Sequence, residues 1–291
     1  MKKFLSFAAF AMFACALTFV SCGSDDDDDN SNPVTPTAPD DKGGEKANDK
    51  DLVGVWELKA RNFLTTYTFT AEKLTIVNTH LGPHENTQTI FDGPYTLKDG
   101  VLSYTTTTEV YDTVSHKNVE RPITISFTTK LLYNKSTLAL LATVNNGDRS
   151  SEEVVLMFKK DTPVPATIAD IQGNWYWYMD GDSTDTRAAF KIEQNRMIIV
   201  IVAWGQRYDG TFTYENGLIN FNVEAQYTSR GNPQGEGWGR GALDPETLEA
   251  NWEPLNPDSW LSYDFEQMPF VANGNEAYGT IANLTGVYYK K

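Results

Sequence analysis

The chain has 291 residues and a formal net charge of −15, with 39 acidic and 24 basic side chains. Proteins that bind nucleic acid neutralise phosphates with clustered Lys and Arg, so this balance argues against DNA or RNA as a partner. The length allows two modest hydrophobic cores, because domains commonly have about 100–150 residues.

The N-terminal residues have the parts of a secretory signal peptide. A basic start and the apolar stretch 4–20 precede Ser21 and Cys22. A membrane-spanning helix needs about 20 apolar residues, and polar residues interrupt this stretch. We therefore predict a cleaved signal over residues 1–21. Cleavage removes Cys15 and leaves one thiol, so no disulfide is expected.

The stretch Phe19–Ser24 resembles the lipobox of bacterial lipoproteins. The resemblance implies that Cys22 carries acyl chains such as palmitate, which anchor the protein in the outer membrane of a Gram-negative bacterium. Two or more acyl chains hold a protein firmly on a membrane, whereas one binds marginally. The five aspartates of Asp25–Asp29 are similar to a surface-export signal of some Gram-negative bacteria. The alternative is a solvated spacer.

Two composition changes divide the remaining chain. Residues 22–50 hold almost nothing that a core could bury, so we expect a disordered acidic tether there. Two prolines in the stretch 161–167 favour an extended link, and we place a linker at 162–168. The predicted domains are therefore 51–161 and 169–291.

The two domains share three landmarks in the same order, which indicates an internal duplication. Each opens on a Gly-x-Trp triplet, continues to a turn with Asn-Gly or Asp-Gly, and closes on a strand that ends in two lysines. The matched pairs are Gly54-Val55-Trp56 with Gly173-Asn174-Trp175, Asp99-Gly100 with Asn216-Gly217, and Lys159-Lys160 with Lys290-Lys291.

Alternation of apolar and polar residues predicts antiparallel β-structure in both domains. It is clear in the stretches 121–128 and 219–226, where one face is apolar and the other is polar. Asp-Gly and Asn-Gly between such runs favour tight hairpins with positive φ. About eight short strands per domain is the number with which a sheet closes into a small barrel. We therefore predict an all-β protein with two tandem eight-stranded antiparallel barrels.

The Gly-x-Trp triplets that begin at Gly54 and Gly173 resemble the opening of the first strand in lipocalins. This resemblance implies an up-and-down barrel in each domain. The opening tryptophan then closes one end of the barrel, and any ligand lies in the other end. A pair of β-sandwiches is the alternative fold.

Six of the seven tryptophans lie in the second domain, several beside polar residues. Trp175 is expected in the core. Aromatic faces flanked by hydrogen-bonding groups suit sugars or flat apolar ligands, although packing in the core is the alternative. The candidate ligand-binding residues are Trp177, Trp204, Trp238, Trp252 and Trp260.

The strand predicted at 197–204 is apolar on both faces, unlike its neighbours. Its outward side must therefore be covered. We expect the first domain to cover it, with a ligand or a protein partner as the alternative.

The sequence contains little that predicts catalysis or metal binding. The loop 180–185 has three carboxylates but no terminal glutamate, which favours an ordinary turn over a calcium site. Gly-Pro separates His80 from His84 and argues against zinc. Asp264 and Glu266 are expected to face solvent, and no nucleophile elbow or phosphate-binding loop occurs. We expect no enzyme activity, no metal and no cofactor.

The function predicted from these features is non-catalytic binding by a surface lipoprotein. The ligand expected is a small apolar or amphiphilic molecule or a glycan. The alternative is a structural or protein-interaction module of an envelope complex, with barrels that are packed solid. An open cavity in the second barrel favours the first function, and a filled interior favours the second.

Overall fold

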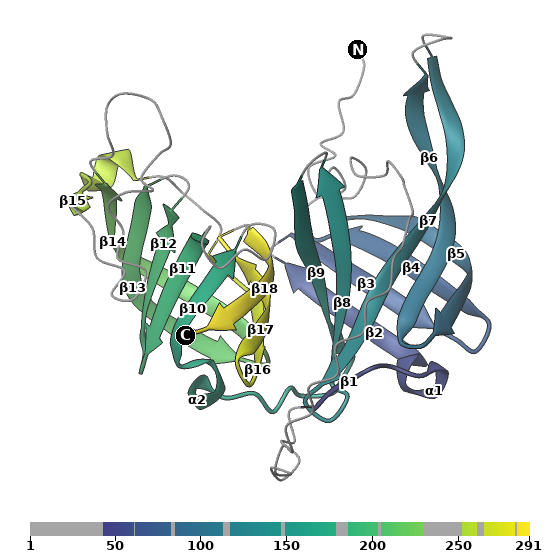
Figure 1. Cartoon of the computed structure of the whole chain (residues 1–291), viewed down its shortest axis with the longest axis horizontal. Helices are drawn as coiled ribbons and strands as arrows, with labels where there is room; N and C mark the ends of the chain where they lie inside the picture. The colour runs from purple at the N-terminus through teal and green to yellow at the C-terminus, as the bar shows by residue number, and fades with distance from the viewer. Residues whose placement is uncertain are drawn as a thin grey trace, which may run out of the picture.

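The computed structural model shows an all-β protein with two closed barrels side by side (Figure 1). The predicted signal peptide, Cys22 and the acidic run lie outside the residues that it describes. Those residues are 43–60, 62–82, 85–112, 117–146, 149–178, 186–202, 205–229, 252–260, 265–282 and 284–291.

Barrel 1 consists of eight antiparallel strands, each paired with the next along the chain, and the pairing of β2 with β9 closes it. A short strand, β1 (Gly43–Glu45), pairs with the end of β7 and lies within the range predicted as tether. Helix α1 (Asp49–Leu52) precedes β2. The strands are β2 (Gly54–Ala60), β3 (Phe63–Phe69), β4 (Lys73–His80), β5 (Asn86–Lys98), β6 (Val101–Asp112), β7 (Lys117–Leu132), β8 (Thr137–Asn146) and β9 (Arg149–Lys159).

Barrel 2 repeats this order with eight strands, and the pairing of β10 with β18 closes it. The connection from β14 to β16 contains β15 (Trp252–Pro254), which pairs with β14, and a 3-10 turn at Pro257–Ser259. Helix α2 (Ile168–Ile171) precedes β10. The strands are β10 (Gly173–Tyr178), β11 (Thr186–Glu193), β12 (Arg196–Ile201), β13 (Gln206–Glu215), β14 (Leu218–Ser229), β16 (Met268–Asn273), β17 (Glu276–Ile281) and β18 (Leu284–Lys290). The prediction of two eight-stranded barrels is confirmed.

A buried tryptophan closes one end of each barrel. The indole N–H of Trp56 donates to the last residue of α1, and that of Trp175 to the last residue of α2, at 2.8 Å in both cases. The ammonium groups of Lys159 and Lys290 lie 5.6 and 5.3 Å from the centres of these rings, within cation–π distance. We call this end of each barrel the closed end.

The two matched hairpins also have the same backbone conformation. Asp99 and Gly100 have φ values of 53° and 79°, and Asn216 and Gly217 have 51° and 77°. Two consecutive positive φ angles are typical of the type I′ turn, which fits the twist of the flanking strands. The shared caps and turns set a residue-by-residue correspondence between the barrels.

The barrels pack against each other through equivalent strands, β7 to β9 of barrel 1 and β16 to β18 of barrel 2 (Figure 1). The Tyr133 hydroxyl donates to the carbonyl of Ala272 at 2.5 Å, and the Lys130 ammonium lies 2.9 Å from the Glu276 carboxylate. Contact between equivalent faces is typical of a two-fold interface. The buried residues are Leu132, Tyr133, Ala139, Val154, Leu156, Val164, Val271, Tyr278 and Val287.

The outward face of β12 is covered within barrel 2. Val200 and Val202 are buried in a cluster with Tyr176 and Ala189, and Trp252 packs against it. The expectation that the first domain covers this face is therefore wrong. The reason is that barrel 1 contacts the opposite side of barrel 2, at β16 to β18.

Within the part of the chain that the structure describes, no helix has the length and hydrophobicity needed to span a membrane.

Candidate functional site

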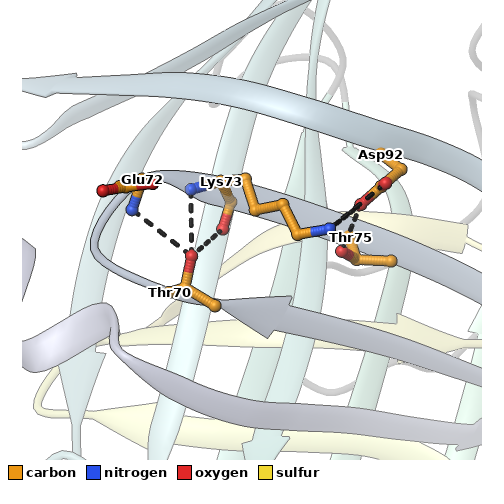
Figure 2. Close-up of polar contacts among 5 residues, drawn as sticks. All are labelled: Thr70, Glu72, Lys73, Thr75 and Asp92. Carbon is orange, nitrogen blue, oxygen red and sulfur yellow. Dashed lines mark hydrogen bonds and ion pairs between the residues drawn. The ribbon is translucent and has the colours of Figure 1, made fainter.

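Figure 2 shows a polar cluster on β4 and β5 of barrel 1. The Thr70 hydroxyl accepts hydrogen bonds from the backbone N–H groups of Glu72 and Lys73 and so fixes the turn before β4. The Asp92 carboxylate accepts from the Thr75 hydroxyl at 2.6 Å and from the Lys73 ammonium at 2.9 Å. These hydrogen bonds, that from Thr75 first, lower the pKa of Asp92. Lys73 and Asp92 are about half exposed, so the cluster is an ordinary surface network that fixes a turn and a strand pair.

The predicted tryptophan site is only partly covered by the described residues, which exclude Trp204 and Trp238. Trp177 packs against the interior of barrel 2, whereas Trp252 packs against the outward cluster that contains Tyr176. The Trp260 indole donates to the carbonyl of Leu255 at 3.2 Å. Trp177 and Trp252 therefore lie on opposite faces of the sheet.

Aromatic side chains fill the interior of barrel 2. Toward the closed end, Phe270 makes edge contacts with Trp175 and Phe190. Further along the barrel, Phe265, from the connection before β16, lies edge-on to Tyr208 and Phe221 at 5.1 and 5.3 Å between ring centres. Such ring contacts leave little room, so the described interior of barrel 2 is a packed core.

Barrel 1 has a packed floor at its closed end. Trp56, Leu74, Leu102, Leu138 and Met157 are completely buried there. Side chains alternate between the two faces of a strand, so the residues two and four positions along from these also face inward.

The next inward side chains, among them Ile76, Tyr104 and Leu140, are also buried, and only those nearest the other end of the barrel are half-buried. They come from strands on all sides of the barrel, at the end opposite α1. We call this set the barrel 1 mouth. It consists of Leu58, Thr65, Asn78, Ile125, Ala142, Glu153 and Val155.

Strand pairing also ends early around the mouth. β2 and β9 pair only at Trp56 and Glu57, although both strands continue beyond these residues. β7 and β8 pair only from Thr128 and Leu141 toward the closed end. The β6–β7 hairpin extends past the remaining strands in Figure 1. At the mouth the barrel thus separates into the β2–β5 sheet, the β6–β7 hairpin and the β8–β9 hairpin, and β10 and β18 of barrel 2 likewise pair at only two positions.

Two oxygen atoms in the mouth lack hydrogen-bond donors. The side-chain oxygen of Asn78 is buried and has no partner. Glu153 takes part in none of the hydrogen bonds and ion pairs of the described residues, and burial raises the pKa of its carboxyl group. A buried acceptor without a donor loses its water and gains nothing in return, which costs about 1–3 kcal/mol. This cost applies to the Asn78 oxygen, whereas the half-buried Glu153 carboxylate is partly desolvated but still accessible to water.

The equivalent positions in barrel 2 are apolar. The pairing of Trp56 with Lys159 corresponds to that of Trp175 with Lys290, and this fixes the match between strands. Thr65 then corresponds to Ala188, Asn78 to Ile201, Ala142 to Ile281, Glu153 to Leu284 and Leu58 to Trp177. The fold does not need polar residues at these positions.

A concave region lies at the closed end of barrel 1. It is a depression of about 390 Å³ beside the 99–100 hairpin, lined by backbone and side chains of Lys46, Asn48, Asp49 and Leu97. It is shallow and lined partly by the segment that precedes α1. The depression therefore lies between the segment that precedes α1 and the floor of the barrel.

The described residues contain no cluster of three or more side chains that could bind a metal ion. His80 packs edge-on against Phe63 at the rim of barrel 1, 5.0 Å between ring centres. Glu266 is exposed, and the loop 180–185, His84 and Asp264 lie outside the described residues.

Comparison of the chain with family models, with curated proteins and with solved structures found no match.

Proposed function

We propose that this protein is a lipid-anchored surface protein of a Gram-negative bacterium that binds a small amphiphilic ligand in the barrel 1 mouth without catalysis. Anchoring through acyl chains on Cys22 rests on the signal-like N-terminus. The lipocalin-like role rests on the two closed barrels with capping tryptophans.

The observation that carries the binding proposal is the contrast between inward side chains of the two barrels. Ala188, Ile201 and Ile281 of barrel 2 are buried, whereas Thr65, Asn78 and Ala142 at the equivalent positions of the mouth are half-buried. Ligand sites of this kind are concave, mostly apolar and carry a few polar groups that orient the ligand. Leu58, Ile125 and Val155 supply the apolar wall, and Asn78 and Glu153 supply the polar groups.

This proposal moves the ligand away from the tryptophans of barrel 2. Trp175 and Trp177 both pack against a filled interior, so they stabilise that barrel. Barrel 2 then serves as a support for barrel 1, through the contact between equivalent strands.

Native mass spectrometry of the protein purified from its own cells tests the binding proposal. We expect a bound small molecule in the wild-type protein. Ala142→Phe places a ring in the mouth and should remove the bound molecule, whereas Ala169→Phe, on the exposed side of α2, should retain it. The proposal is wrong if no ligand is bound and the protein binds nothing on panels of fatty acids, amphiphiles and glycans.

The anchor requires a separate test. Cells grown with an alkyne analogue of palmitate should label the wild-type chain and leave Cys22→Ala unlabelled. Protease added to intact cells should degrade the wild-type chain if it lies on the cell surface. Label on the Cys22→Ala chain contradicts the anchor, and protection from protease contradicts the surface location.

A structural role is the second candidate, and one observation favours it. The β6–β7 hairpin projects beyond the barrel, where neither β5 nor β8 pairs with it. Long two-stranded ribbons are marginal alone in water and are commonly stabilised by a partner. Crosslinking from this hairpin to an envelope protein, without any bound small molecule, would favour this role.

A further inference from the structure

The barrel 1 mouth has unpaired hydrogen-bond acceptors, and this limits the chemistry of a ligand that fits it. The Asn78 side-chain oxygen is buried without a donor. The Glu153 carboxylate has no ion-pair partner among the described residues and no hydrogen bond. A ligand that ends in a carboxylate or phosphate offers no donor to the Asn78 oxygen, and its negative charge is repelled by the Glu153 carboxylate.

These acceptors are not required by the architecture. Barrel 2 has Ile201 and Leu284 at the two equivalent positions, where Ile201 is 1% exposed and Leu284 is partly buried against the core. Polar groups that lower stability, and that an equivalent barrel replaces with apolar ones, are typical of binding sites. The difference therefore points to recognition.

The apolar residues of the mouth indicate the chemistry of the other end of the ligand. Leu58, Ile125 and Val155 are half-buried and pack on the aromatic and aliphatic floor. They offer an apolar wall that a hydrocarbon chain or ring can cover, at about 25 cal/mol for each Å² removed from water.

We propose that the barrel 1 mouth selects amphiphiles whose polar end is a protonated amine, with Glu153 and Asn78 as its acceptors and the hydrocarbon part on the apolar wall. This inference rests on the proposed function and names its ligand class. An ammonium group supplies both the positive charge and the N–H donors. Hydrogen bonds between charged partners are about twice as strong as neutral ones.

The test uses four probes with the same ten-carbon chain: decylamine, decyltrimethylammonium, decanol and decanoate. Binding to the full mature chain is measured by isothermal titration calorimetry below the concentrations at which the probes form micelles. The chain carries Cys22→Ala, so that no acyl chain of its own competes for the mouth. Decylamine should bind tightest, and decanoate at least about tenfold more weakly. The trimethylated probe keeps the charge without N–H donors and should fall between them.

Variants assign the selectivity to its residues. Glu153→Gln keeps the shape and should reduce the preference for decylamine over decanol by about tenfold. Asn78→Leu should weaken the binding of decylamine and decanol, which both donate hydrogen bonds. It should leave the affinity for decanoate unchanged. Glu215→Gln, an exposed site on barrel 2, is the matched control and should behave as wild type. Circular dichroism checks that each variant is folded.

The outcomes separate the two proposals. Equal affinity for decanoate and decylamine, or an unchanged preference in folded Glu153→Gln, overturns the amine inference while leaving binding in the mouth intact. Failure of all four probes to bind, together with no ligand in native mass spectra, overturns the proposed function itself.

Discussion

Barrels 1 and 2 have the same arrangement at the closed end. At the other end, their inward side chains differ in polarity. Trp56 and Trp175 make the same hydrogen bond and the same cation–π contact. At the other end, Asn78 and Glu153 of barrel 1 stand where barrel 2 has apolar side chains that pack together. Folding therefore restricts the closed end in both copies. The inward residues at the other end can differ between the copies. In barrel 2 they are apolar, whereas barrel 1 keeps polar groups among them.

The largest effect on stability is expected from replacing the tryptophan that closes each barrel. Trp175→Ala should lower the free energy of unfolding by about 3–5 kcal/mol, because it removes a buried ring from a filled core. Trp56→Ala should cost a similar amount, since Trp56 is also completely buried in a packed floor. Urea denaturation of both variants measures the two losses. A clearly smaller loss for Trp56→Ala would contradict equal packing at the two closed ends.

The contact between barrels comes next. Val271→Asp places a carboxylate in the buried cluster between them and should cost about 2–3 kcal/mol. It should also split one calorimetric transition into two, because the barrels no longer stabilise each other. Val53→Asp is the control, since Val53 is 45% exposed. A single transition at an unchanged temperature would show that this cluster does not stabilise the contact between the barrels.

A variant with the residues of barrel 2 tests the comparison most directly. The double substitution Asn78→Ile and Glu153→Leu should raise the free energy of unfolding by about 1 kcal/mol, because it removes the unsatisfied Asn78 oxygen and a partly desolvated carboxylate. The same variant should lose amphiphile binding. Thermal unfolding and calorimetric titration measure the two effects. Loss of stability would mean that the polar pair supports the fold, contrary to the comparison.

The smallest effect is expected from pH. Burial raises the pKa of Glu153 above its ordinary value of 4.5, so the folded state binds its proton more tightly than the unfolded state. Stability relative to Glu153→Gln should therefore fall slightly as pH rises from about 4.5 toward neutrality. The melting temperatures of the two proteins, measured between pH 4.5 and 7, should converge at the acid end. Parallel curves would place Glu153 in solvent.

Much of the fold was predictable because it depends on local signals. Gly-x-Trp and the Asn-Gly and Asp-Gly turns mark short-range backbone requirements, and the structure has each of them. The mouth was not predictable from alternation. In the stretch 154–158 every residue is apolar, because one face lines barrel 1 and the other packs against barrel 2. With both faces buried, nothing in the sequence shows that Glu153 faces inward.

The tryptophans of the second domain show a different limit of the sequence, which does not tell on which face of the sheet each side chain lies. Trp177 and Trp252 are near in sequence to polar residues, yet they lie on opposite faces of the sheet. Which face a side chain takes depends on strand register and on the β15 excursion. Amino-acid composition predicts neither the strand register nor the position of β15. The cover of β12 was missed for the same reason, since it comes from a connection inside barrel 2.

Strand β1 determines how a force on the N-terminal chain reaches the folded protein. It pairs with the end of β7, next to the barrel caps, and Gly44 lies so close to Asn273 of barrel 2 that a side chain there would collide with it. Tension along the N-terminal chain therefore acts first on the joint between the barrels, at their closed ends.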